Sequence, residues 1–145
     1  MWVANRYGTV SRIDPRTNAV VATVTVGSWT HGVAVGAGRI WVVRAARWGL
    51  LKGTVLQIDP KTNRLIGDSI PVGQYAWSVV VGQGSVWVSN PNDDSISRID
   101  PVTNQVNATL RVPCPWGLAI SKTNLWVAHT GRVSICGYAI TSLTP

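Results

Sequence analysis

Glutamate is absent from the 145-residue sequence, whose acidic side chains are six aspartates. Histidine occurs twice, as His31 and His129, and two imidazoles without a carboxylate or thiolate beside them make an incomplete metal shell. The sequence also contains no Gly-x-Ser-x-Gly motif, no phosphate-cradling glycine loop and no Cys/His metal motif. These absences lead us to predict no metal site, no cofactor and no catalytic residue.

Long apolar runs are missing as well. No stretch of about 18 apolar residues occurs, so no transmembrane helix is expected. Residues 1–10, MWVANRYGTV, lack the charged region followed by an apolar core that marks a signal peptide. No membrane partner is therefore predicted, and the compartment of the protein stays unknown.

Cysteine occurs twice, as Cys114 and Cys136, at a spacing that matches neither a metal motif nor Cys-x-x-Cys. A disulfide requires Cα atoms within about 7 Å of each other. The strand assignment given below places the two residues near opposite ends of one sheet, so two separate thiols are predicted. Their oxidation state, and with it the redox compartment, stays open.

Positive charge exceeds negative charge, because 13 lysines and arginines against six aspartates give a formal net charge of +7. Such a surplus attracts anionic partners, and a nucleic-acid site would gather the charges on one face. Here they are spread along the chain, so nucleic acid is disfavoured, and a basic polyanion-binding module is kept as a second alternative function. The scattered positions are Arg6, Arg12, Arg16, Arg39, Arg64, Arg98, Arg111 and Arg132.

What the sequence does contain is a repeat. Trp-Val pairs begin at Trp2, Trp41, Trp87 and Trp126, and Ile-Asp-Pro-x-Thr-Asn hexamers begin at Ile13, Ile58 and Ile99. A period of about 40 residues with several short strands in each period is typical of β-propellers. The repeat units are expected at approximately 1–28, 29–73, 74–112 and 113–145.

Each full unit predicts four strands, named A to D from the propeller axis outward. The first unit lacks strand A, and the last unit has a weak strand C around Val133–Ile135 and lacks strand D. The predicted fold class is all-β, a partial β-propeller of about three and a half four-stranded antiparallel blades. We expect one domain that is a fragment or an open arc. Exposed sheet edges invite a second copy, so a homo-oligomer that closes the propeller is a hypothesis.

Residues 2–27, WVANRYGTVSRIDPRTNAVVATVTVG, and residues 86–112 resemble the YVTN-type β-propeller repeat family. The pattern also resembles the virginiamycin B lyase-like propeller proteins. The resemblance implies the fold and leaves the function open, because such repeats occur in secreted surface proteins, periplasmic binding proteins and enzymes. For a longer parent protein, a periplasmic or secreted location stays open.

The virginiamycin B lyase resemblance implies an elimination that breaks an ester bond, with histidine and glutamate around a magnesium ion. This chain offers no position for the glutamate. A C–O lyase is therefore the alternative function, expected to be inactive here, and magnesium is expected only if that alternative holds. We expect that the chain is not an enzyme.

In a propeller the D-to-A and B-to-C loops lie at the same end of the axial channel, and two repeat positions line its mouth. The residue before strand A is His31, Trp77 or Trp116, and the residue closing strand B is Asn5, Arg44, Asn90 or His129. Rings and hydrogen-bonding groups that converge on a concave surface are typical of a ligand site. The alternative is that Trp77 and Trp116 plug the channel as core residues.

The B-to-C loop of the second unit is longer than its counterparts, and its extra residues include Arg47 and Trp48. An insertion in one loop of a repeat commonly marks the binding face. The alternative is electrostatic pairing with residues 92–94, Asn-Asp-Asp, of the next unit.

Two repeated positions are predicted to be structural. The tryptophan of each Trp-Val pair is expected to be buried between sheets, and the aspartate of each hexamer is expected to bond the turn backbone. These residues are Trp2, Trp41, Trp87, Trp126, Asp14, Asp59 and Asp100.

The predicted function is a binding or scaffold module that presents its axial loop face to an unknown protein or small-molecule ligand. The ligand-binding candidates are His31, Arg44, Arg47, Trp48, Trp77, Asn90, Trp116 and His129.

Overall fold

The computed structural model describes residues 1–46, 51–131 and 137–143. Over this part the chain forms fourteen β-strands and the short 3₁₀ helix η2 (Pro91–Asp93). The strands are β1 (Trp2–Asn5), β2 (Thr9–Asp14), β3 (Ala19–Thr25), β4 (Thr30–Gly36), β5 (Arg39–Arg44), β6 (Lys52–Asp59), β7 (Arg64–Gln74), β8 (Val79–Gly82), β9 (Ser85–Asn90), β10 (Ser95–Asp100), β11 (Gln105–Arg111), β12 (Pro115–Ile120), β13 (Leu125–Gly131) and β14 (Gly137–Leu143).

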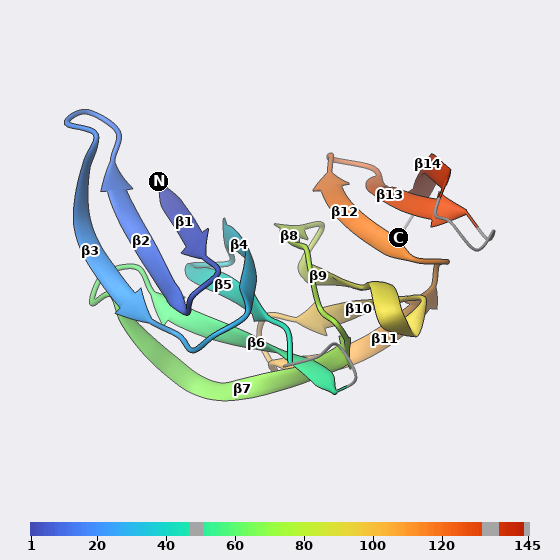
Figure 1. Ribbon diagram of the computed structural model, residues 1–145, viewed down its shortest axis with the longest axis horizontal. Coiled ribbons are helices and arrows are strands. Elements are labelled where there is room, and N and C mark those ends of the chain that lie inside the picture. The colour runs from blue at the N-terminus through green and yellow to red at the C-terminus, as the bar shows by residue number, and fades with distance from the viewer. Residues whose placement is uncertain (47–50, 132–136, 144–145) are drawn as a thin grey trace.

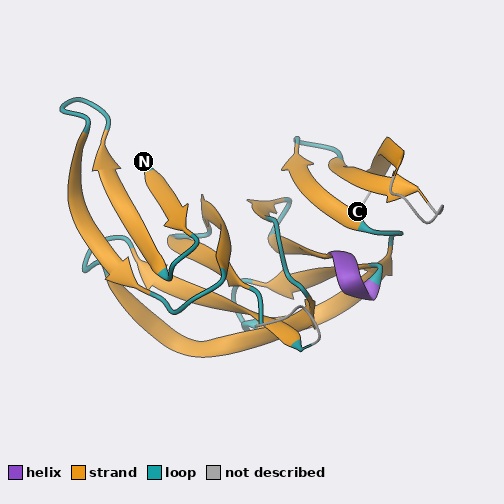
Figure 2. Ribbon diagram, viewed as in Figure 1, coloured by secondary structure: helices purple, strands orange, loops and turns teal. Residues whose placement is uncertain are grey.

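The strands form four antiparallel sheets, β1–β3, β4–β7, β8–β11 and β12–β14, with three, four, four and three strands. Figures 1 and 2 show the sheets fanned in an open arc, with β1, β4, β8 and β12 toward its concave side. The predicted all-β partial propeller is confirmed. The third strand of the last sheet is Gly137–Leu143. The stretch around Val133–Ile135, where the sequence placed this strand, lies outside the described residues.

The Ile-Asp-Pro-x-Thr-Asn hexamers form the turns between the two outer strands of the first three sheets. In each turn the aspartate Oδ1 accepts the backbone N–H two residues later, which is the local bond that favours Asp in turns. The three bonds run from Arg16, Lys61 and Val102 to Asp14, Asp59 and Asp100, at 2.9, 2.8 and 2.7 Å. The hydrogen bond from Lys61 above all, together with those from Thr62, holds the pKa of Asp59 below its ordinary value.

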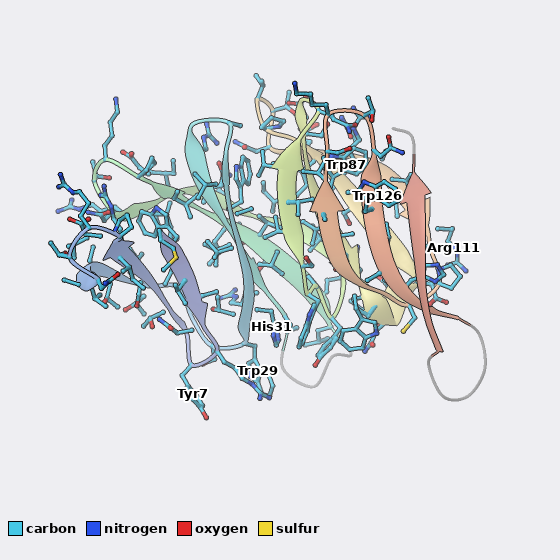
Figure 3. The ribbon with its side chains drawn as sticks, turned by 90° about the horizontal axis from the view of Figure 1, so that it is seen from above. Tyr7, Trp29, His31, Trp87, Arg111 and Trp126 are labelled. Atoms are coloured by element: carbon cyan, nitrogen blue, oxygen red, sulfur yellow. The ribbon has the colours of Figure 1, made fainter. Side chains whose placement is uncertain are left out.

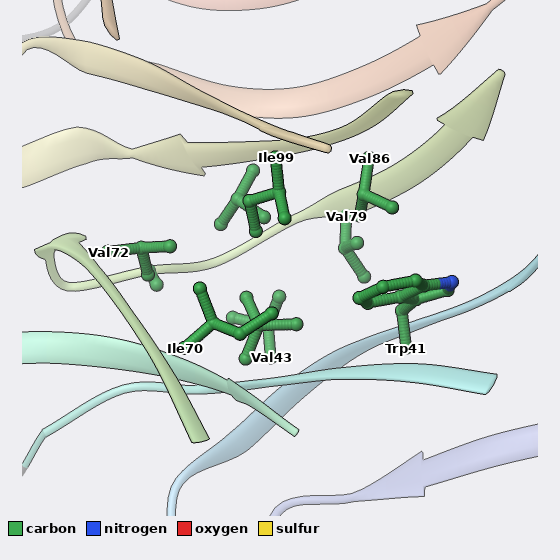
Figure 4. Close-up of a cluster of buried hydrophobic side chains, with 10 residues drawn as sticks. Trp41, Val43, Ile70, Val72, Val79, Val86 and Ile99 are labelled. Atoms are coloured by element: carbon green, nitrogen blue, oxygen red, sulfur yellow. The ribbon is translucent and has the colours of Figure 1, made fainter. Parts of the chain in front are cut away.

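The hydrophobic core is divided among the three spaces between successive sheets. Figure 4 shows the middle one, where Trp41 and Val43 of the second sheet pack against Val79, Val86 and Ile99 of the third. Trp87 occupies the corresponding place before the fourth sheet. Trp41 and Trp87 are 0% and 1% exposed. Burial of one such ring stabilises the fold by at least about 2–3 kcal/mol.

Both buried indoles also bond a glycine at the end of the strand beside them. The Nε1–H of Trp41 donates to the carbonyl of Gly36 at 3.0 Å, and that of Trp87 donates to Gly82 at 3.3 Å. A Cβ at Gly36 would lie 2.4 Å from Cγ1 of Val81 in the next sheet. Glycine is therefore required here, because any side chain would push the neighbouring sheets apart.

Arginine side chains over Trp2 and Trp41 link successive sheets. The guanidinium of Arg12 lies 5.7 Å from the Trp2 ring centre and donates to Oδ1 of Asn63, in the turn of the second sheet, at 3.1 Å. The guanidinium of Arg39 repeats the contact, because it donates to Oδ1 of Asn104, in the turn of the third sheet, at 3.0 Å. Some of the positive charge therefore serves the packing of the sheets.

The two outermost tryptophans of the repeat differ from the inner pair. Trp2 is half-buried against the core between the first and second sheets. Trp126 is 44% exposed, although the sequence predicted burial at this position. The exposure arises because no sheet among the described residues covers that face of β12–β14.

Candidate functional site

The loops at one end of the arc are joined by backbone hydrogen bonds. In the first two sheets, Gly27 N–H donates to Gly8 O at 3.1 Å and Trp29 N–H donates to Arg6 O at 3.1 Å. The B-to-C loop of one sheet therefore lies against the connection to the next sheet, as a propeller requires. We call this end the axial loop face. Figure 3 shows Tyr7, Trp29 and His31 at this end, and Trp87 and Trp126 toward the opposite end.

Each connection that leads into an inner strand carries a tripeptide of the same conformation. Its first residue has a left-handed backbone, and its middle residue is buried. The tripeptides are Trp29-Thr30-His31, Tyr75-Ala76-Trp77 and Cys114-Pro115-Trp116, and their first residues have φ of 65°, 56° and 43°. A left-handed residue other than glycine costs roughly 1–2 kcal/mol. Strain of this kind clusters at functional sites.

The third residues of these tripeptides meet each other and Tyr75, and we call His31, Tyr75, Trp77 and Trp116 the axial aromatic cluster. The His31 and Trp77 rings are stacked with centroids 4.3 Å apart, and Tyr75 and Trp77 are stacked at 5.6 Å. The rings of Trp116 and Trp77 meet edge to face, with their centroids 5.1 Å apart. All four residues are half-buried, so they contact one another and still present ring surface to solvent.

A pocket of about 400 Å³ opens beside the cluster. Its lining combines aromatic rings with one arginine, and consists of Ala4, Arg6, Thr30, His31, Tyr75 and Trp77. A second hollow of about 350 Å³ adjoins it through Arg6 and is also lined by Tyr7, Ser28 and Trp29. Neither lining contains an aspartate, so the electrostatic potential in both hollows is set by the Arg6 guanidinium.

His31 is the titratable ring of this pocket. Burial lowers the pKa of its imidazole, and the positive charge of Arg6 lowers it further. The ring is therefore neutral at pH 7. Its Nε2 atom is buried and has no hydrogen-bond partner among the described residues. Such an atom costs about 1–3 kcal/mol.

Asn90 lies inside its sheet and does not face the pocket. The residue is 0% exposed, and its Nδ2 donates to the hydroxyl oxygens of Ser95 and Ser97 at 3.2 and 2.9 Å. Asn5 makes the equivalent bonds to Thr9 and Ser11 at 3.0 and 2.9 Å. At this repeat position asparagine therefore connects strand B to strand C.

Arg44 and His129 are the other ligand-binding candidates that were predicted at the residue closing strand B. Both lie close to loop backbone. Arg44 donates to the carbonyl of Val26 at 3.4 Å, at the connection between the first and second sheets. His129 is half-buried and pairs with Pro115 across the ladder of β12 and β13. Arg47 and Trp48 lie outside the described residues.

Asp93 and Asp94 were the alternative partners of the insertion that contains Arg47 and Trp48. In the structure both aspartates accept hydrogen bonds from the backbone of loops. Oδ2 of Asp93 accepts Gln74 N–H at 2.7 Å, and Oδ1 of Asp94 accepts Cys114 N–H at 2.9 Å. The first bond holds Gln74, directly before the left-handed Tyr75, and the second holds Cys114, which is itself left-handed. The acids therefore set the conformation from which Tyr75 and Trp116 are presented. Cys136 lies outside the described residues, so the two separate thiols stay a prediction.

Arg6, Trp29 and Tyr75 are among the residues of the two hollows that were not found from the sequence. Trp29 and Tyr75 precede His31 and Trp77 by two positions, and Arg6 follows the repeated position of Asn5. The sequence did contain a signal for Trp29 and Tyr75, because an aromatic residue occurs twice at the same distance before strand A.

Among the residues that the structure describes, no three His, Cys, Asp or Glu side chains come together as a metal would require. In the same stretches, no helix has the length and apolar character needed to cross a bilayer.

No protein-family model and no curated protein matches the chain. Solved structures of β-propellers do resemble it. Hydrazine synthase of Kuenenia stuttgartiensis has a TM-score of 0.84 at 18% identity, over 99% of this chain and 42% of that chain. Sqt1 of Saccharomyces cerevisiae has 0.70 at 10%, over 88% and 38%, and BamB of Moraxella catarrhalis has 0.63 at 12%, over 88% and 37%. These likenesses show the fold, and this chain spans less than half the length of each.

Proposed function

We propose that the chain is part of a propeller-based binding module of the YVTN repeat type, and that the axial aromatic cluster binds a small molecule. The observation that carries the proposal is the pocket of about 400 Å³ formed where loops of the first three sheets converge. Ligand pockets commonly measure about 300–1,000 Å³ and combine apolar walls with a few polar groups. This pocket has both features.

The half-burial of the rings favours a binding surface over a plug. The repeated tryptophans that serve as core, Trp41 and Trp87, are almost fully covered, whereas Trp77 and Trp116 keep exposed ring surface. A channel plug would be expected to be as fully covered as these core rings.

We propose a non-catalytic role. The sequence supplies no glutamate, so one of the two residue types that the resemblance to a virginiamycin B lyase implies around the magnesium ion is missing from this chain. Hydrazine synthase is an enzyme by its name, but an identity of 18% carries the fold and no activity.

Calorimetric titration with 2-naphthamide, a neutral planar probe, tests the proposal. We expect binding at about millimolar affinity or tighter, and a loss of at least about tenfold in Trp77→Ala. Trp126→Ala is the matched control, because it removes an exposed indole from the opposite end. Absence of binding heat, or equal losses in the two variants, would refute the proposal.

A further inference from the structure

We propose that the pocket beside the axial aromatic cluster selects planar aromatic ligands that carry a carboxylate or a comparable anionic group. This inference rests on the proposed function and narrows the class of ligand. It follows from three features of the pocket: the arrangement of its rings, the identity of its charged group and the hydrogen bonds that neighbouring arginines already make.

The rings of the cluster offer flat surfaces gathered around Trp77. His31 and Trp77 are inclined by 26° and Tyr75 and Trp77 by 28°, whereas His31 and Tyr75 are inclined by 53° to each other. Offset stacking on such a set favours a planar, unsaturated ligand over a globular aliphatic one. Trp116 adds an edge contact to Trp77, at 81°.

Arg6 is the charged group of both hollows, and its side chain is exposed. Its guanidinium lies 5.4 Å from the centre of the Trp29 ring, a contact that orients the planar fork without using its hydrogen-bond donors. Over the described part of the chain, the one ion pair joins Arg16 and Asp14 at 3.7 Å, in a turn at the other end. Arg6 is therefore available to a carboxylate, which it can bind with two parallel hydrogen bonds.

The neighbouring charges favour a single anionic group over a polyanion. Arg44, another described arginine of this face, already donates to the Val26 carbonyl. Arg12 and Arg39 are bonded to turn asparagines between the sheets. A polyanion needs a row of available cations, and among the described residues Arg6 is the one cation in the lining of the two hollows.

Paired titrations with 2-naphthoate and 2-naphthamide test the inference, because the two probes share a ring system and differ in charge. We expect the naphthoate to bind about tenfold more tightly, and Arg6→Gln to abolish the difference. Arg64→Gln is the matched control. It removes the same charge from an exposed residue beside the turn at the opposite end, and should preserve the tenfold preference.

The outcomes separate this inference from the proposed function. Equal affinity for the two probes, with Trp77 still required, overturns the anionic class and leaves a neutral aromatic site. Binding of neither probe overturns both proposals. Loss of naphthoate affinity by the same factor in Arg6→Gln and Arg64→Gln, together with competition by heparin, overturns the inference in favour of a diffuse polyanion surface. The melting temperature of Arg6→Gln should match that of the unmodified chain, since the side chain is exposed.

Discussion

Trp77 and Trp87 belong to the same repeat unit but have different environments. Trp87 is 1% exposed, packs between two sheets and bonds Gly82. Trp77 is half-buried and contacts other rings from neighbouring sheets. The position of Trp87 carries tryptophan in all four units, whereas the position of Trp77 carries histidine in one. In this chain the unvarying position supplies core rings where a following sheet covers it, and the varying position belongs to the axial loop face.

A second difference separates Trp87 from Trp126, which occupies the same place in the next sheet. The two residues occupy the same position in the strand pairing of their sheets, but of the two only Trp87 is covered by a following sheet. Burial is therefore a property of the interface between sheets, and the single repeat does not determine it. The first predictions below test this difference.

The largest effect is expected for removal of a covered indole. Trp87→Ala should lower the free energy of unfolding by about 3–5 kcal/mol, because it loses the buried ring and leaves a cavity. Trp126→Ala, at the equivalent but exposed position, should change it by less than about 1 kcal/mol. Urea unfolding measures both, and equal losses would show that the fourth sheet is covered in solution.

A smaller loss is expected where two sheets approach through glycine. Gly36→Ala places a Cβ within 2.4 Å of Val81 Cγ1 and should cost about 1–3 kcal/mol. Gly117→Ala is the control, since its Cβ would meet Ala128 at an ordinary 3.5 Å. If the two variants have the same midpoint of unfolding, the sheets are not packed this closely.

The arginine contact between sheets should contribute less. Asn63→Gly keeps the left-handed turn but removes one of the two acceptors of Arg12, the other being the Pro60 carbonyl, and should cost about 0.5–1.5 kcal/mol. Asn18→Gly changes the equivalent exposed turn residue of the first sheet and should be nearly neutral. A double-mutant cycle with Arg12→Met checks the assignment, and additive losses would contradict it.

The smallest effect concerns pH. Because the pKa of His31 is lowered in the folded chain, the unfolded chain takes up this proton first as the pH falls below 6.5. Stability should therefore decrease with acid through this range. His31→Phe should reduce the dependence and keep a ring against Trp77. The midpoint of urea unfolding at pH 7 and at pH 5 measures the effect. If the difference between the two midpoints is the same in the variant as in the original chain, His31 is excluded as its source.

The sequence predicted most of the fold because its signals are local. Alternating strands, the Asp-Pro turns and the repeated Trp-Val pair each depend on a few neighbouring residues, and they specified the sheets of the arc. The exposure of Trp126 could not be predicted in this way, because it depends on whether another sheet packs against that face.

The candidate site was predicted only in part. His31, Trp77 and Trp116 come together as rings, whereas Asn90 bonds serines inside its sheet. A polar residue that closes a strand looks the same in sequence whether it points inward or outward. Arg6 and Tyr75 were missed because their place at the pocket depends on loops from different sheets meeting. The hydroxyls that follow Asn5 and Asn90 were an available sign of their structural role.

A nuclear magnetic resonance titration of the indole N–H signals with 2-naphthoate tests the central claim most directly. The claim is that the rings of the axial loop face bind ligand and the rings of the Trp-Val pairs hold the sheets together. The predicted result is that the signals of Trp77 and Trp116 shift with added probe while those of Trp41 and Trp87 stay in place. Shifts confined to Trp126, or spread equally over all the indoles, would contradict it.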